Sequence, residues 1–396
     1  MELPAISRQR EIQLVLATLA SKLAVVLFSV FVLVSYVDLY DINIYYTAMG
    51  NLLQGHVPWY GGTAFFYPPL ALVPMMAAYL ASVAVGAGFT GFVVGLNALM
   101  IACDIVTTFC VYYVALRMYP EEVAARAALL SATAISVAFF VLTRYDSFPA
   151  CLAMLALTAA VYGRPSRGYW WSVAGFFAKL WPLFLFPFLW LYHSKDSSPW
   201  IEARRRALRI LAIAAVAFVV MLVVGYNQFL TYAGMIYVQT LPYLLSQYMA
   251  MVAPGLPFSV IRDLCLVGIM AVILWGAILV RQDPGIPSLV KAIALSVFAV
   301  AYLNQYQSPQ YIVWVTPFLA LLVADDPLGA LAFVAVQVLA YVEFPLVFWH
   351  LWINTRYTSP AAIPFFTVFY AAWAFLLWRA VRCDPQEVPG AKGGSP

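Results

Sequence analysis

Nine charged residues lie in segments that link long apolar runs, and they are the side chains best placed for chemistry at a membrane surface. The acids are Asp38, Asp41, Asp146, Asp263 and Glu343, and the bases are Arg144, Lys179, Arg262 and Arg356. A carboxylate in such a place can take a proton from a hydroxyl group, and a cation can hold a phosphate. Together they are what a membrane enzyme that acts on a lipid-linked phosphate substrate needs.

Asp41 is the main candidate for a catalytic base. It opens the segment DINIYYTAMGNLLQG (41–55), whose apolar residues recur at helical spacing, so we expect an amphipathic helix lying on the membrane. A carboxylate in the first turn of a helix is favoured by the helix dipole and stays ionised, ready to accept a proton. Asp38 is its rival, and either acid could instead serve only to cap this helix.

The basic candidates differ in how strongly their positions indicate a bound anion. Lys179 lies between two half-length apolar helices, where an unpaired ammonium is costly, so it needs a protein acid or a lipid phosphate beside it. Arg144 and Asp146 share a very short loop, where they could bind substrate or form a purely structural ion pair. Arg356 and His350 are weaker candidates because their loop is longer.

The remaining polar residues predict less. Gln305, Gln307 and Gln310 in the segment NQYQSPQY could bind sugar hydroxyls or cap the membrane interface. Lys22 and Asp104 fall inside apolar helices at comparable depth, and we interpret them as a structural pair. The 5 cysteines have no paired spacing and the 3 histidines are scattered, so neither a disulfide framework nor a metal site is predicted.

Composition defines the elements that must position these residues. The chain has 396 residues, of which 65% are hydrophobic and 10% are charged, and its mean hydropathy is +0.89. Its continuous apolar runs are long enough to cross the roughly 30 Å hydrocarbon layer as helices. We therefore expect one all-α, integral-membrane domain over residues 1–396, with no cleavable signal, because the first apolar stretch (14–36) is too long. The net charge of +4 requires no nucleic-acid partner.

The distribution of Lys and Arg decides between two topologies that differ in whether residues 67–85 cross the membrane. If this run stays outside, all but four of the 21 basic residues fall on the inner side, and we prefer that arrangement. It predicts about 12 membrane helices (11 to 13), both termini in the cytoplasm and functional residues on the outer side. The expected external loops are 37–88, 226–259 and 343–360, and residues 383–396 form a short cytoplasmic tail. The twelve helices are expected near 14–36, 90–116, 124–142, 147–162, 169–178, 181–193, 207–225, 260–280, 288–303, 309–323, 328–342 and 361–381.

Four sequence features, taken in order, resemble those of the GT-C superfamily of integral-membrane glycosyltransferases. They are DINIYY followed by GHVPWY and YPPL in the first external loop, RYDSFP (144–149), KLWPLFLFP (179–187) and SPQYIVW (308–314). The resemblance is to the polyprenyl-phosphate-mannose-dependent α-mannosyltransferases of glycosyltransferase family 87 in particular, and also to GPI mannosyltransferase I. It covers most of the chain. Phe65 and Phe66 stand where many relatives have an acid.

The resemblance implies an inverting, metal-independent hexosyltransferase without a cofactor, with mannose favoured over glucose. Its donor would be a polyprenyl- or dolichyl-phosphate sugar, and its acceptor a glycolipid or glycan at the outer face of the cell membrane or the lumenal face of the ER membrane. An accessory subunit is compatible with it. The family's first-loop aspartate, which acts as the base, falls on Asp41. We assign the donor phosphate to Lys179, Arg144 and Arg356, and sugar or acceptor contacts to Asp146, Gln310, Tyr311, His350 and Tyr45.

Two other classes of protein fit the composition. A multi-pass transporter or flippase of polar or lipid-linked solutes would show internal repeats and charged helices that meet near the midplane. The sequence shows no convincing repeat, and its functional-looking residues gather on one side. A structural membrane subunit that supports another transferase has the same loop composition as an enzyme.

Overall fold

The computed structural model describes residues 3–31, 38–59, 65–194, 200–223, 225–226, 237, 239–353 and 362–383, and every regular element among them is a helix. In the first half these are α1 (Arg8–Phe31), α2 (Tyr40–Leu53), η1 (Pro69–Ala71), α3 (Leu72–Ala84), α4 (Gly88–Ala115), α5 (Glu121–Ala132), α6 (Ile135–Thr143), α7 (Ser147–Val161), α8 (Pro165–Ala178), η2 (Trp181–Phe184) and α9 (Leu185–Ser194). In the second half they are α10 (Trp200–Val223), α12 (Leu241–Val252), α13 (Phe258–Gln282), α14 (Ile286–Tyr302), η3 (Pro309–Tyr311), α15 (Ile312–Val323), α16 (Pro327–Tyr341), η4 (Val342–Ile353) and α17 (Ala362–Arg382).

Six of the described helices are long and apolar enough to cross a membrane, and a seventh span results if the bent pair α5–α6 counts as one. This confirms a helical, multi-pass membrane protein. Four further apolar stretches among the described residues, η1–α3, α7, α14 and η3–α15, are 10–17 residues long and too short for a full span, and the last three lie where membrane helices were expected. They account for part of the difference from the expected twelve.

The helix expected over 124–142 is broken, and α5 and α6 meet at 49°. The backbone of Ala134 is extended (φ −60°, ψ 108°), which ends the helical bonding at this point. The carbonyl of Ala132, freed at the end of α5, accepts hydrogen bonds from Ser21 Oγ (2.8 Å) and Lys22 Nζ (3.3 Å) of α1. The break is therefore stabilised by side chains from a distant helix.

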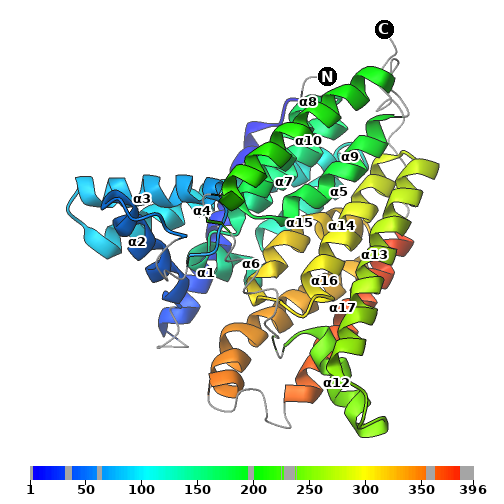
Figure 1. Cartoon of the computed structure of the whole chain (residues 1–396). Helices are drawn as coiled ribbons and strands as arrows, with labels where there is room; N and C mark the ends of the chain where they lie inside the picture. The colour runs from blue at the N-terminus through cyan, green and yellow to red at the C-terminus, as the bar shows by residue number, and fades with distance from the viewer. Residues whose placement is uncertain are drawn as a thin grey trace.

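Lys22 and Asp104 form the buried ion pair that their depth predicted, and it joins α1 to α4. Helix α4 packs against α1, α3, α5 and α7, and so links the N-terminal helices to the centre of the bundle. Helices α2 and α3 lie together on one flank beside α4, with α3 running across the direction of the long helices (Figure 1). Helix α2 confirms the expected helix over 41–55 and carries Asp41 in its first turn.

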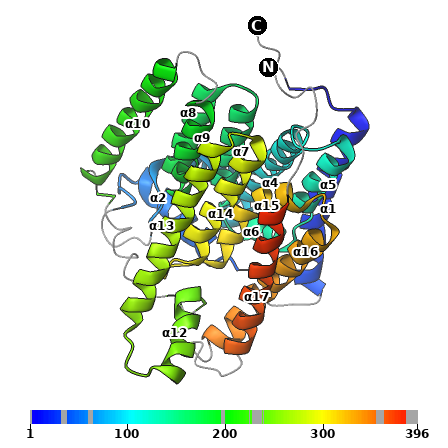
Figure 2. The same ribbon diagram turned by 90° about the vertical axis from the view of Figure 1, so that its right-hand side faces the viewer.

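Helices from the second half of the chain form the side of the functional site that lies opposite α2. Helix α12 lies within the expected external loop 226–259, next to α13 and away from the α8, α9 and α10 end of the molecule (Figure 2). Helix α15 follows the loop between α14 and η3, and its Trp314 Nε1 donates a hydrogen bond to Asp146 in the link between α6 and α7. Among the predicted site residues, Arg356 lies outside the described part of the chain, and the side chain of His350 is likewise not described.

Candidate functional site

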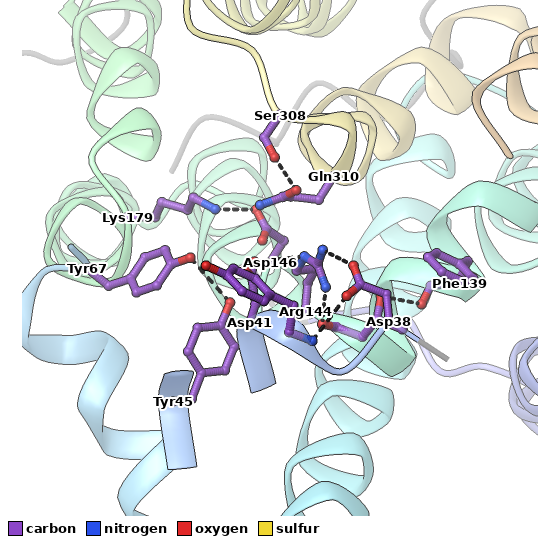
Figure 3. A network of polar contacts seen from close by, with 12 residues as sticks. Asp38, Asp41, Tyr45, Tyr67, Phe139, Arg144, Asp146, Lys179, Ser308 and Gln310 are labelled. Carbon is purple, nitrogen blue, oxygen red and sulfur yellow. Dashed lines mark hydrogen bonds and ion pairs between the residues drawn. The ribbon is translucent and has the colours of Figure 1, made fainter. Parts of the chain in front are cut away.

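Three carboxylates and two cations from separate parts of the sequence come together where the start of α2 meets two short links (Figure 3). Asp38 and Asp41 lie at the N-terminus of α2, and Lys179 follows α8. The link between α6 and α7 contributes Arg144 and Asp146. All five were candidates from the sequence, and the fold makes them neighbours.

Arg144 lies between the two acids of α2. Its Nη2 donates a hydrogen bond to Asp38 Oδ2, its Nε lies 2.9 Å from Asp41 Oδ2, and its Nη1 donates to the Thr143 carbonyl at 2.8 Å. The side chains of Arg144 and Asp38 are 6% and 5% exposed, whereas that of Asp41 is 19% exposed. Of the two acids that hold Arg144, Asp41 is therefore the one that a substrate can reach.

Lys179 pairs with the other acid of the cluster. Its Nζ lies 2.6 Å from Asp146 Oδ1, and the same oxygen accepts a hydrogen bond from Trp314 Nε1 at 2.6 Å. Of the two alternatives left open for Arg144 and Asp146, a structural pair between them is not formed, because each residue has other partners. Four aromatic rings surround the ammonium with centroids 5.1–5.6 Å from Nζ, a distance at which cation–π attraction is effective. The rings belong to Tyr67, Tyr145, Tyr311 and Trp314.

The electrostatic setting makes Asp41 a stronger base than an exposed carboxylate. Burial raises the pKa of the Asp41 carboxyl above its ordinary value, the Arg144 charge opposes that rise, and the nearby Asp38 charge adds to it. A higher pKa means a greater affinity for a proton, which suits a group that must take one from a hydroxyl. The arrangement therefore provides a partly exposed carboxylate with a raised pKa beside Arg144.

A cavity of about 680 Å³ lies beside the cluster. Its polar wall includes Lys179, Arg262, Asn304 and Gln305, and the rest is apolar or aromatic. Its apolar and aromatic lining residues are Phe66, Tyr67, Pro68, Leu180, Trp181, Phe184, Tyr226, Leu266, Val300, Tyr306, Tyr311 and Trp314. Tyr67 belongs both to this wall and to the cluster, where its hydroxyl lies 3.4 Å from that of Tyr45 (Figure 3). Lys179 both lines the cavity and pairs with Asp146, so the cavity and the carboxylate cluster meet at Lys179.

The residues expected to contact sugar or acceptor are distributed unevenly. Tyr311 lines the cavity. Tyr45 and Asp146 are fully buried, and Gln310 is buried and accepts a hydrogen bond from Ser308. None of these three residues is among those that line the cavity.

Sequence reasoning missed several lining residues. Arg262, the fifth residue of α13, was recognised as an outer cation but not as part of the site, because no local pattern brings it near Lys179. Tyr67 and Trp314 belong to the YPPL and SPQYIVW features, yet nothing in those features showed that their rings surround Lys179. Within the described ranges, no group of three or more His, Cys, Asp or Glu side chains is arranged to hold a metal ion.

Comparison with known proteins gives a remote structural likeness. No protein-family model and no curated protein matches the sequence. The chain is similar to the crystal structure of the Archaeoglobus fulgidus oligosaccharyltransferase in the apo form, with a TM-score of 0.48 and 12% identity over 96% of this chain and 56% of that one. It is also similar to Archaeoglobus fulgidus AglB, an archaeal oligosaccharyltransferase in complex with an inhibitory peptide and a dolichol-phosphate, with a TM-score of 0.44 and 10% identity over 97% and 57%. The chain spans a little over half the length of these enzymes.

Proposed function

We propose that the chain is a GT-C-type membrane glycosyltransferase that moves a hexose from a polyprenyl- or dolichyl-phosphate donor to a hydroxyl of a glycolipid or glycan. The observation that carries this proposal is the accessible carboxylate of Asp41, held beside Arg144 and next to a cavity with two cations and apolar walls. The resemblance to family 87 favours mannose as the sugar.

The proposed reaction is a single displacement. Asp41 takes the proton of the acceptor hydroxyl, the hydroxyl oxygen attacks the anomeric carbon, and the bond from that carbon to the phosphate oxygen breaks. The bonding electrons leave with the lipid phosphate, and the configuration at the anomeric carbon is inverted. Arg144 stabilises the ionised form of Asp41 and fixes its orientation before the reaction.

The donor phosphate is assigned to the cations that line the cavity, Lys179 and Arg262. They would stabilise the negative charge that grows on the leaving phosphate. Arg144 was the other described candidate for this role, but two carboxylates engage it and it does not line the cavity. The apolar walls suit an isoprenoid chain, and the rings of Trp181 and Trp314 offer flat surfaces for a sugar.

The proposal includes the membrane arrangement expected from the sequence. Adding the short elements α7, α8, η2–α9, α14 and η3–α15 to the seven possible spans gives about 12 membrane elements. The termini then lie in the cytoplasm, and the carboxylate cluster lies at the outer or lumenal face. Transfer is expected to need no metal ion, and an accessory subunit remains compatible with the exposed helix surfaces.

Asp41→Asn tests the proposal directly, with Glu122→Gln on the exposed first turn of α5 as the matched control. We expect Asp41→Asn to lower transfer from radiolabelled polyprenyl-phosphate mannose to extracted lipids by about 10²- to 10⁴-fold, the usual contribution of a general base. Both variants should unfold at the same temperature in detergent.

Full activity of Asp41→Asn would remove Asp41 from the mechanism, and loss of activity in Asp38→Asn alone would transfer its role to Asp38. Uptake of solute into proteoliposomes without release of sugar from the lipid donor would identify a transporter instead.

A further inference from the structure

The loop between α14 and η3 (residues 303–308) has one side on the cavity and one side in the protein interior. Asn304, Gln305 and Tyr306 line the cavity, whereas Gln307 is 0% exposed. The loop supplies both amide side chains of the polar wall. Whatever fixes the backbone of this loop therefore also fixes the polar wall of the cavity.

Gln307 is held from behind by two residues, Gln239 and Tyr370, and we name these three residues the rear clamp. The Tyr370 hydroxyl, on α17, lies 2.9 Å from Gln307 Oε1 and 2.9 Å from the Gln239 carbonyl, so that its single proton is shared between them. Gln239 Nε2 donates to the Gln307 carbonyl at 2.9 Å. All three side chains are buried. The last helix of the chain thus reaches the back of the cavity loop.

The segment that carries Gln239 is tied to the same loop at a second point. The Tyr237 backbone N–H donates to the Gln305 carbonyl at 2.9 Å, and the rings of Tyr237 and Tyr306 pack edge to face with centroids 4.8 Å apart. Because Gln305 and Tyr306 line the cavity, these bonds connect the rear clamp to the side chains that a ligand would touch.

The rear clamp leaves two buried amide atoms unused. Within the part of the chain that the structure describes, Gln239 Oε1 and Gln307 Nε2 have no hydrogen-bond partner. Two of the three clamp hydrogen bonds end on Gln307, so the clamp acts on the loop at this residue.

We propose that the rear clamp is a positioning unit that shapes the donor cavity from α17, and that Tyr370 is its central residue. This inference rests on the proposed function, because it treats the cavity as the donor site. None of the three residues touches the cavity, so they act on donor binding through Asn304, Gln305 and Tyr306.

Tyr370→Phe removes only the hydroxyl, and Tyr302→Phe on α14 is the matched control, since Tyr302 is a buried tyrosine whose hydroxyl takes no part in the clamp. We expect Tyr370→Phe to raise the KM for polyprenyl-phosphate mannose about tenfold while kcat stays within about twofold. Gln307→Met should act alike, and the double variant should be no worse than either single one, because the residues form one unit. Unchanged KM in Tyr370→Phe, or additive losses, would overturn the inference.

Two measurements that need no sugar transfer separate this inference from the proposed function. Amide hydrogen exchange should be faster in residues 303–308 of Tyr370→Phe than in wild type or Tyr302→Phe, and sugar-free polyprenyl phosphate should quench the fluorescence of Trp181 and Trp314 with weaker affinity. If these changes occur in a protein that transfers no sugar, the proposed function fails and the positioning role stands. If transfer occurs but exchange, affinity and KM are equal in all variants, the positioning role fails alone. Wild type that binds no polyprenyl phosphate overturns it as well.

Discussion

Replacing Lys179 by methionine removes the ammonium and keeps a chain of similar length among the four rings. Asp146, whose side chain is 1% exposed, then keeps only the Trp314 N–H on Oδ1, and its Oδ2 has no hydrogen-bond partner among the described residues. Removing one member of a buried ion pair costs about 3–5 kcal/mol, because the remaining charge stays buried without compensation. The cation–π contacts contribute about 0.5–2 kcal/mol each, but they share one ammonium and do not add, so the pair sets the magnitude.

Unfolding in detergent measures this cost, and the double variant Lys179→Met, Asp146→Asn separates stability from function. The double variant carries no charge at either position of this pair and should recover most of the lost stability. Its KM for the lipid-linked donor should stay raised, because the cavity still lacks the cation assigned to the phosphate. A loss below about 1 kcal/mol in the single variant, the value of an exposed pair, would refute the argument from burial. A wild-type KM in the double variant would remove Lys179 from the phosphate site.

Three further predictions concern other charged groups. Because burial raises the pKa of Asp41, kcat/KM should begin to fall on the acid side at a higher pH than an ordinary aspartate would give. Asp38→Asn removes a charge that raises this pKa, so it should move the acid limb of the pH–rate profile to lower pH. A move of that limb to higher pH would contradict the assignment of Asp41 as the base. Lys22→Met should lower the free energy of unfolding by about 3–5 kcal/mol, and the double variant Lys22→Met, Asp104→Leu should restore it. Equal unfolding temperatures of wild type and both variants would contradict the stability argument from the burial of this pair. Arg262→Gln should raise the KM for the donor about tenfold, and Arg262→Lys should raise it much less, with kcat unchanged in both. If steady-state kinetics give Arg262→Gln the KM of wild type, Arg262 does not contact the phosphate.

The sequence predicts helices well where the signal is local. The helical spacing of apolar residues from Asp41 onward gave α2 within two residues at each end, because such a period reports directly on a buried face. The break between α5 and α6 was not predictable in this way. No proline or glycine marks it, and its stabilising bonds come from Ser21 and Lys22, far away in the sequence.

The site shows the same division. The depth of Lys179 required an anion, which is an argument from burial alone, but the choice of Asp146 depended on how α7 and α8 pack. Arg144 and Asp146 do not pair with each other, although the sequence left that alternative open, because the backbone changes from extended at Arg144 (φ −142°, ψ 167°) to helical at Asp146 (φ −60°, ψ −22°). The two side chains consequently reach different partners. The position of Arg262 in the cavity wall depends on the tertiary fold, so no local sequence pattern predicted it.

The three-residue link between α6 and α7 connects the proposed base, Asp41, to Lys179 and the four aromatic rings around it. Arg144 at one end holds the acids of α2, and Asp146 at the other end holds Lys179, so the two ion-pair groups share one short connection. With three carboxylates and two cations, the fully ionised cluster carries one net negative charge, which disfavours a phosphate among the acids. A phosphate is therefore expected on the cavity side of Lys179, where Arg262 also lies.

The same charge count couples the two halves of the proposed reaction. When Asp41 accepts the proton, the cluster becomes neutral at the moment when the leaving phosphate gains a second negative charge. The loss of negative charge at Asp41 offsets the gain on the phosphate, because both are felt by Lys179 and Arg144 in a poorly solvated site. Asp41→Asn would remove the base and also that negative charge from the ground state. It should therefore bind the donor at least as tightly as wild type while transferring sugar about 10²- to 10⁴-fold more slowly, and weaker donor binding by this variant would contradict the charge argument.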